Sequence, residues 1–289
     1  MPTPDFLIIG AMKSGTTTLY RDMLRHPGVF MPIDKEPHVL CSDHVLTPRG
    51  REDYASLFRD GRLGQKRGEA STGYTKRPMH ENVADRSLEV CGPDLRLIYI
   101  VRDPVERALS HHYHEVAMGD GPPDFTEAIE RNPGIIEFSR YAWQLEPWIE
   151  RFGKDNILVL IFEEYVQDRR SGVSAAWRHI GLEPPGDFTL AGDGHNRGET
   201  RVRLNGLGGA IQANPIYRRL IRPASSPELR DRVKRLFGRP VPPRPEKPPP
   251  TVLAEIRDRL APDAEKLSRF LQRPHNIWDL PVAENAHTH

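Results

Sequence analysis

The sequence predicts an α/β fold with a central parallel sheet covered by helices on both faces. Three apolar runs indicate buried strands, at residues 6–9 (FLII), 95–101 (LRLIYIV) and 157–162 (ILVLIF). Segments with helical spacing of their apolar residues follow these runs. Strands that are apolar on both sides and alternate with helices are typical of a parallel sheet buried between two helical layers.

The first strand leads directly into a loop rich in glycine and hydroxyl residues, GAMKSGTTT at residues 10–18. Backbone amides in such a loop, together with the amino end of the following helix, form a site for an anion. A Walker A loop has a lysine directly after its second glycine, whereas here Thr16 follows Gly15 and Lys13 lies inside the loop. We therefore predict that the loop binds an anionic nucleotide group, but not ATP with magnesium in the P-loop manner.

The remaining elements follow from local patterns. A short strand is expected at residues 29–31. Helices are expected at residues 17–25, 53–58, 105–116, 125–130, 135–152, 173–180, 215–237 and 252–271. The proline-rich segment 239–250, RPVPPRPEKPPP, is expected to form an extended strap, either a surface linker or a ligand for an SH3-like partner.

Length, charge and cysteine content limit the classes of function. We expect one domain over all 289 residues, with a core at about residues 5–182. Because 41 lysine and arginine residues balance 40 acidic residues, bulk charge gives no support for nucleic acid as a partner. The two cysteines, Cys41 and Cys91, form neither a disulfide framework nor a zinc pattern.

The chain gives no sign of a targeting or membrane-spanning segment. The strand signal begins at Phe6, which leaves no room for a signal peptide before the loop. No run of about eighteen apolar residues occurs, so a membrane span is not expected. These features predict a cytoplasmic protein.

A second candidate site element follows the strand at residues 95–101. Arg102 stands at its carboxyl end, and Ser110 follows eight residues later on an expected helix. Ligands of open α/β sheets bind at the carboxyl ends of the strands, so Arg102 and the loop with Lys13 are expected at one edge. A nucleotide with phosphates at two ends fits this arrangement.

At these residues the chain resembles the sulfotransferases that use 3′-phosphoadenosine 5′-phosphosulfate (PAPS). KSGTT (residues 13–17) resembles their 5′-phosphosulfate loop, and RDPVERALS (residues 102–110) resembles their 3′-phosphate motif. KEPH (residues 35–38) extends the similarity toward heparan-sulfate-type and bacterial carbohydrate sulfotransferases. The resemblance covers roughly residues 6–182 and implies a P-loop-like three-layer α/β/α fold in a single domain.

The resemblance also implies roles for individual residues. Lys13 stabilises the leaving phosphate, and the loop residues that add further donors are Ser14, Gly15, Thr16, Thr17 and Thr18. Arg102 and Ser110 bind the 3′-phosphate, and Arg201 or Arg203 closes over it from a covering loop at about residues 187–209. The product is 3′-phosphoadenosine 5′-phosphate (PAP), and no metal is proposed.

The acceptor hydroxyl must lose a proton, so a general base is required. By resemblance to the heparan-sulfate-type enzymes this base is Glu36, although the residues alone also allow a surface carboxylate paired with Lys35. His38 is the competing base, because a neutral imidazole suits proton transfer near neutral pH. The neighbouring His111, His112 and His114 are expected on a helix surface rather than around a metal.

Departures from the heparan-type pattern bear on the acceptor. Val39, Leu40 and Cys41 stand where those relatives carry two phenylalanines and an acidic residue, and Ala70 stands where some carry a lysine. The expected acceptor is therefore a hydroxyl of another sugar or of a glycosylated small molecule. A P-loop nucleotide kinase and a non-catalytic nucleotide- or glycan-binding module are the alternatives, and the oligomeric state is left open.

Overall fold

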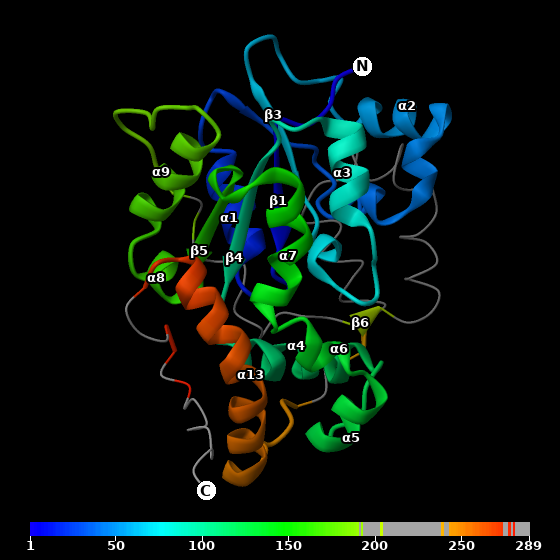
Figure 1. Ribbon diagram of the computed structural model, residues 1–289, viewed down its shortest axis with the longest axis vertical. Coiled ribbons are helices and arrows are strands. Elements are labelled where there is room, and N and C mark those ends of the chain that lie inside the picture. The colour runs from blue at the N-terminus through cyan, green and yellow to red at the C-terminus, as the bar shows by residue number, and fades with distance from the viewer. Residues whose placement is uncertain are drawn as a thin grey trace, which may run out of the picture. The chain divides into compact units, whose positions relative to one another are not determined.

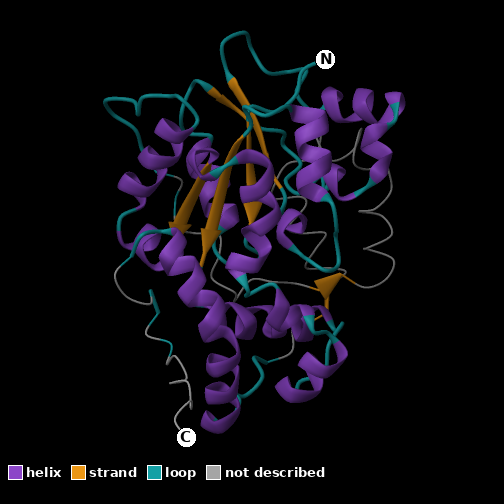
Figure 2. Ribbon diagram, in the orientation of Figure 1, coloured by secondary structure: helices purple, strands orange, loops and turns teal. Residues whose placement is uncertain are grey.

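The computed structural model describes residues 1–190, 192, 203–204, 238–239, 243–273, 277–278 and 280. Within them, five parallel strands form a sheet in the order β2-β3-β1-β4-β5. Figure 2 shows the strands in orange among the purple helices. The strands are β1 (Phe6–Gly10), β2 (Val29–Phe30), β3 (Lys66–Ala70), β4 (Arg96–Val101) and β5 (Ile157–Ile161). After β1 the chain forms β2 and β3 on one side of that strand, and then crosses to form β4 and β5 on its other side. This reversal places a topological switch point beside β1.

The sheet separates two apolar clusters, because successive side chains of a strand point to opposite faces. Leu7 and Ile9 of β1 belong to one cluster, with Leu97, Tyr99 and Val101 of β4. The alternate residues of the same strands belong to the other: Phe6, Ile8, Ile98 and Ile100. All nine side chains are fully buried, as expected for strands covered on both faces.

Helices supply the outer two layers (Figure 1). The helices whose side chains join the cluster of Leu7 are α2 (Pro48–Ser56), α3 (Val83–Cys91), α7 (Tyr141–Phe152) and α13 (Pro250–Phe270). Those that join the cluster of Ile8 are α1 (Thr16–Met23), α8 (Phe162–Gln167) and α9 (Arg169–His179). The predicted three-layer α/β/α fold is therefore confirmed.

The other described elements are short, apart from one helix. They are α4 (Pro104–Met118), α5 (Phe125–Arg131) and α6 (Gly134–Glu137), with the 3-10 turns η1 (Val39–Cys41), η2 (Asp43–Leu46), η3 (Thr72–Thr75) and η4 (Lys154–Asn156). Two short antiparallel strands, β6 (Arg203–Leu204) and β7 (Gly238–Arg239), pair with each other.

The chain divides into two compact units. The first comprises Met1–His111, Ile129–Ala191 and Pro248–His289, and the second comprises His112–Ala128 and Gly192–Lys247. The five-stranded sheet lies in the first unit, as do the candidate residues up to Ser110. That all 289 residues act as one domain stays a prediction, and the helix expected at 215–237 lies outside the described residues.

The largest departures from the expected elements have local causes. The helix expected at 135–152 is broken, because the chain leaves the helical conformation at Arg140 (φ −84°, ψ 73°) before α7 starts. The strand β3 has the polar sequence KRGEA, so apolar periodicity does not reveal it. Between residues 243 and 249 the strap has no regular secondary structure, and Pro249 (φ −52°, ψ 149°) has the backbone conformation of a polyproline helix.

Candidate active site

The loop after β1 is built as an anion site. Gly15 has φ +90°, a conformation that favours glycine, and an added Cβ would lie 2.8 Å from the ring of Phe162. α1 begins directly after it, with no side-chain cap and no acidic residue in its first turn. The positive end of the helix dipole is therefore uncompensated at this loop, as it is in phosphate-binding helices.

Strained backbone is concentrated at the predicted site. Five non-glycine residues in the described part of the chain have positive φ, and three of them are Lys13 (71°), Glu36 (64°) and His38 (54°). Such conformations cost free energy and persist only where the surrounding structure enforces them, which is common at functional sites. The three residues therefore share a backbone property that their sequence pattern does not reveal.

Glu36 is held at the end of β3. Its backbone amide donates to the carbonyl of Ala70 at 2.9 Å. Its Oε1 accepts from the ammonium of Lys35 at 2.5 Å, and its Oε2 accepts from the hydroxyl of Thr72 at 3.0 Å. Nε2 of His38 lies 3.3 Å from the same Oε2. The carboxylate is thus fixed in orientation by donors on both oxygens.

These contacts determine the acidity of Glu36. Burial by itself would raise the pKa of the carboxyl group, since it disfavours the charged form. The hydrogen bond from His38, the charge and hydrogen bond of Lys35, and the hydrogen bond from Thr72 outweigh burial and lower the pKa to about 2. Glu36 is consequently ionised at every physiological pH.

Lys35 connects Glu36 to the loop after β1. Its ammonium lies 3.4 Å from Oγ1 of Thr16, the first residue of α1, as well as 2.5 Å from Glu36. The predicted base and the predicted anion loop therefore belong to one site. The sequence indicated Lys35 only as a possible surface partner of Glu36, yet its side chain is just 16% exposed.

The buried carboxylate of Glu69 is connected to this site through Ser71. Glu69 accepts hydrogen bonds from Tyr54 at 3.1 Å, from Ser71 at 2.8 Å and from Tyr74. Oγ of Ser71 in turn accepts from the backbone amide of His38 at 3.1 Å. Burial raises the pKa of Glu69, although its three hydrogen bonds act in the opposite direction. The sequence did not predict this network.

Arg102 lies where it was expected, at the end of β4. The phenol of Tyr141 donates to its carbonyl at 2.8 Å, which joins α7 to the strand end. Its guanidinium lies over the ring of Phe162, 5.3 Å from the centroid, and Nη2 lies 3.4 Å from Oε2 of Glu106. Asp103 does not pair with Arg102 but caps α4, accepting from the amides of Val105 and Glu106. Arg102 therefore remains available to a ligand if Glu106 releases it.

The other predicted residues divide into three groups. Ser14 is buried in the loop, and Thr17 and Thr18 are half-buried in the first turn of α1. Ser110 is half-buried on α4, about 9 Å along the axis from the start of that helix. Arg203 belongs to β6 in the second unit, and Arg201 lies outside the described residues.

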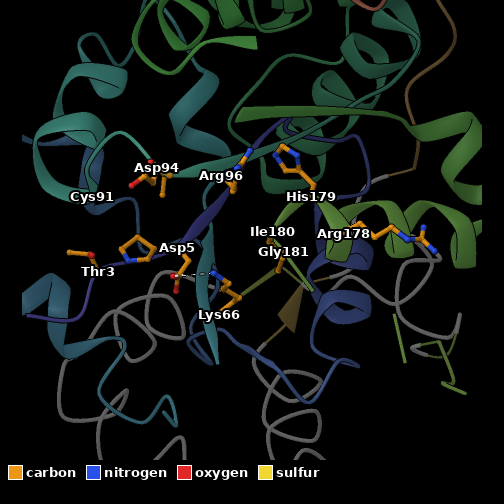
Figure 3. Close-up of a pocket in the computed structure, with 12 residues that line it drawn as sticks. Thr3, Asp5, Lys66, Cys91, Asp94, Arg96, Arg178, His179, Ile180 and Gly181 are labelled. Carbon is orange, nitrogen blue, oxygen red and sulfur yellow. Dashed lines mark ion pairs between the residues drawn. The ribbon is translucent and has the colours of Figure 1, made fainter. Parts of the chain in front are cut away.

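A pocket of about 610 Å³ opens at the amino ends of the strands, the end of the sheet opposite to Glu36 (Figure 3). Asp5 precedes β1, Lys66 begins β3 and Arg96 begins β4, so the pocket faces the amino ends of the strands. It is separate from the site around Glu36. Within the part of the chain that the structure describes, three or more histidine, cysteine or acidic side chains do not gather as a metal-ligand group. His111 and His112, which were expected on a helix surface, are instead buried.

Residues 3–189 match the family model of the sulfotransferase domain. The chain belongs to this family. The match covers the sheet from β1 to β5 and both motifs, the loop with Lys13 and the segment 102–110.

Curated relatives and a solved structure agree with this assignment. Heparan sulfate glucosamine 3-O-sulfotransferase 6 of Homo sapiens is 28% identical over 188 residues, covering 62% of this chain and 53% of that protein. The chain thus spans about half the length of this relative. The crystal structure of a sulfotransferase from Alicyclobacillus acidocaldarius is 22% identical, with a TM-score of 0.65, and covers 96% of this chain and 99% of that one. This likeness confirms the P-loop-like fold.

The relatives contradict the cytoplasmic location predicted from the sequence. They include the membrane-associated sulfotransferase kil1 of Dictyostelium discoideum, 32% identical over 143 residues, covering 46% of this chain and 29% of that protein. The prediction was wrong because it rested on the lack of a targeting or membrane-spanning signal in this sequence, which does not fix the location of a protein. Among the described helices, none combines the length and the apolar character needed to cross a bilayer.

Proposed function

We propose that this sulfotransferase-family chain transfers the sulfuryl group of PAPS to a hydroxyl of a carbohydrate or glycosylated small molecule, with Glu36 as the general base. The observation that carries the proposal is the position of Lys35, whose ammonium contacts both Glu36 and Thr16. It places a carboxylate beside a loop suited to an anion, the two groups that transfer from an anionic donor to an alcohol requires.

The donor set fits PAPS. Lys13, Thr16 and the uncapped start of α1 would hold its 5′-phosphosulfate, while Arg102 would pair with its 3′-phosphate. PAPS supplies an activated sulfuryl group whose leaving group is a phosphate. The cations and amides around the loop would stabilise that leaving phosphate.

The hydrogen bonds favour Glu36 over His38 as the base. A carboxylate can only accept, so Nε2 of His38 must carry the proton in its contact with Glu36. Nδ1 of His38 is buried and has no hydrogen-bond partner among the described residues. His38 is therefore arranged as a donor that orients Glu36, and Glu36 has the ionised form that accepts a proton.

The acceptor class rests on the relatives. Several curated matches act by name on heparan sulfate or on other carbohydrates, which supports a sugar hydroxyl for this chain. Residues 39–41 and Ala70 depart from the heparan-type pattern near the proposed base, which supports a different sugar.

The proposal is tested by incubating the protein with PAPS carrying radioactive sulfur and with panels of saccharides, phenols and lipid glycosides. We expect label to enter a saccharide or glycoside and PAP to be released in equal amount. Label in no acceptor, despite binding of PAP, supports a binding module instead. Transfer of phosphate from ATP with magnesium supports the kinase alternative.

A further inference from the structure

Lys35 lies between the proposed base, Glu36, and the loop after β1 at residues 10–18, which would hold the sulfuryl donor and is called the donor loop below. Its ammonium is 2.5 Å from Oε1 of Glu36 and 3.4 Å from Oγ1 of Thr16, so a small side-chain movement changes its main partner. The lysine side chain is flexible and carries a compact charge with three donors, which suits exchange between two anions. Its side chain is 16% exposed, so solvent screens the charge only weakly.

With its present hydrogen bonds, Glu36 cannot act as the general base. Thr72 and His38 occupy Oε2, and Lys35 lies on Oε1 at 2.5 Å. These contacts hold the pKa of Glu36 at about 2, far too low for efficient proton removal from an alcohol. Lys35 also contacts the donor loop, at Oγ1 of Thr16. Removing it from Oε1 would free one oxygen and raise the basicity of the carboxylate.

We propose that Lys35 is a second cation for the sulfuryl donor: donor binding draws its ammonium from Oε1 of Glu36 to the 5′-phosphosulfate, which releases the base for the acceptor. This inference rests on the proposed function of the same site. It assigns Lys35 two linked tasks, namely stabilising charge on the donor and keeping the base inactive until the donor is present.

The charges around the site favour this exchange. In the absence of donor, the cation Lys35 is balanced by the nearby carboxylate of Glu36. The donor brings several negative charges to the loop beside Thr16 and becomes the stronger partner for an ammonium. The other groups that face Glu36 are His38 and Thr72, while Glu69 lies behind Ser71. Thr72 and His38 keep Oε2 fixed while Oε1 is released.

The transfer step then moves one proton to Glu36 and one sulfuryl group to the acceptor. The acceptor hydroxyl gives its proton to Oε1 of Glu36 while its oxygen forms a bond to sulfur. The bond between sulfur and the bridging oxygen of the 5′-phosphate breaks, and its electron pair remains on the phosphate of PAP. Lys35 and Lys13 stabilise the charge that develops on that phosphate.

The test measures PAP binding by calorimetry in wild type, Lys35→Gln and Lys35→Arg. We expect Lys35→Gln to weaken PAP binding by about tenfold to a hundredfold, the range for losing a charged hydrogen bond. Lys35→Arg should restore part of the affinity. Lys66→Gln is the matched control, since Lys66 pairs with Asp5 at the opposite edge of the sheet, and it should bind PAP like wild type.

A cycle with Glu36→Gln distinguishes direct contact from a general charge effect. Glu36→Gln should bind PAP slightly more tightly than wild type, because Lys35 no longer has a competing partner, and the double variant should lose this gain. Wild-type PAP affinity in Lys35→Gln, with thermal melting unchanged, overturns the role of Lys35 and leaves the proposed function standing. Failure of the wild type to bind PAP overturns both.

Discussion

The hydroxyl of Thr72 donates a hydrogen bond to Oε2 of Glu36 at 3.0 Å. This bond joins the turn after β3 to the segment that carries the proposed base, and it helps to lower the pKa of Glu36. Thr72 begins η3, two residues after the end of β3 at Ala70. The sheet therefore positions the donor that orients the base.

Replacing Thr72 by valine keeps the shape of the side chain but removes the donor. We expect kcat with PAPS to fall by about tenfold, since a hydrogen bond to a charged group contributes about 1.5–3 kcal/mol. Binding of PAP should not change. Thr72→Ser, which keeps the hydroxyl, should retain most of the wild-type kcat. Equal turnover in Thr72→Val and wild type would show that this bond does not orient the base.

Arg102→Ala should weaken PAP binding by about 1.5–3 kcal/mol, the cost of losing a charge-assisted contact. The affinity for adenosine 5′-phosphate, which has no 3′-phosphate, should stay the same. Calorimetry with both nucleotides measures the two effects separately. Arg96→Ala is a suitable control, because Arg96 lines the pocket at the other edge of the sheet. An unchanged preference for PAP would remove Arg102 from the 3′-phosphate site.

Asp22 anchors α1, the helix that follows the donor loop. It is fully buried and accepts from Arg169 at 2.8 Å and from Tyr165 at 2.6 Å. Asp22→Ala removes a buried carboxylate from the mostly buried Arg169, and we expect a loss of about 3–5 kcal/mol in the free energy of unfolding. The exposed pair of Arg151 and Asp85 provides the control: Asp85→Ala should cost less than about 1 kcal/mol. Urea unfolding measures both, and similar losses would contradict the anchoring role.

Glu69→Gln probes the buried network under the site. We expect a loss of about 1–3 kcal/mol in unfolding free energy, because amide hydrogens replace an acceptor facing three hydroxyl donors. Burial raises the folded-state pKa of Glu69, so protonation of this carboxyl group is more favourable in the native protein than in the unfolded chain. That contribution to stability is present below the ordinary pKa of 4.5 and is lost as pH rises through the raised value.

The raised pKa of Glu69 determines how the stability of the protein changes with pH. The stability difference between wild type and Glu69→Gln should be largest in acid and should shrink as the pH rises above 4.5. Urea midpoints at a series of pH values measure it, since the other titrating groups are common to both proteins. A difference that grows with pH would mean that the ionised carboxylate is the favoured form in the native state.

Much of the fold follows from the sequence because three of its strands are buried on both faces. The expected runs at 6–9, 95–101 and 157–162 correspond to β1, β4 and β5 within one residue at each end. The strand β3 escaped prediction because it carries Lys66, Arg67 and Glu69. The apolar pattern that marks a buried strand is absent there, although Ala70 and Glu69 are buried.

The candidate site was predictable only in part. The loop with Lys13 and Arg102 lies at the carboxyl ends of the strands, as the motifs indicated. The hydrogen bond of Glu36 to Ala70, at the end of β3, places Glu36 there as well.

The contacts of Lys35 and Glu69 could not be predicted, because they join distant segments of the chain. Lys35 contacts Thr16, 19 residues away. Glu69 acts through Ser71, whose hydroxyl accepts from the amide of His38, 33 residues from Ser71. A charged dipeptide such as Lys35–Glu36 is usually a solvated pair, and only its partly buried location and its contact with Thr16 distinguish it.

The most direct test of the proposed chemistry compares wild type with Glu36→Gln, using radioactive PAPS and the acceptor found in the saccharide panel. We expect kcat to fall by about a hundredfold or more, because glutamine cannot accept the acceptor proton. PAP affinity should be no weaker than in wild type, which shows that the donor site is intact. Full turnover by Glu36→Gln would contradict the assignment of Glu36 as the base.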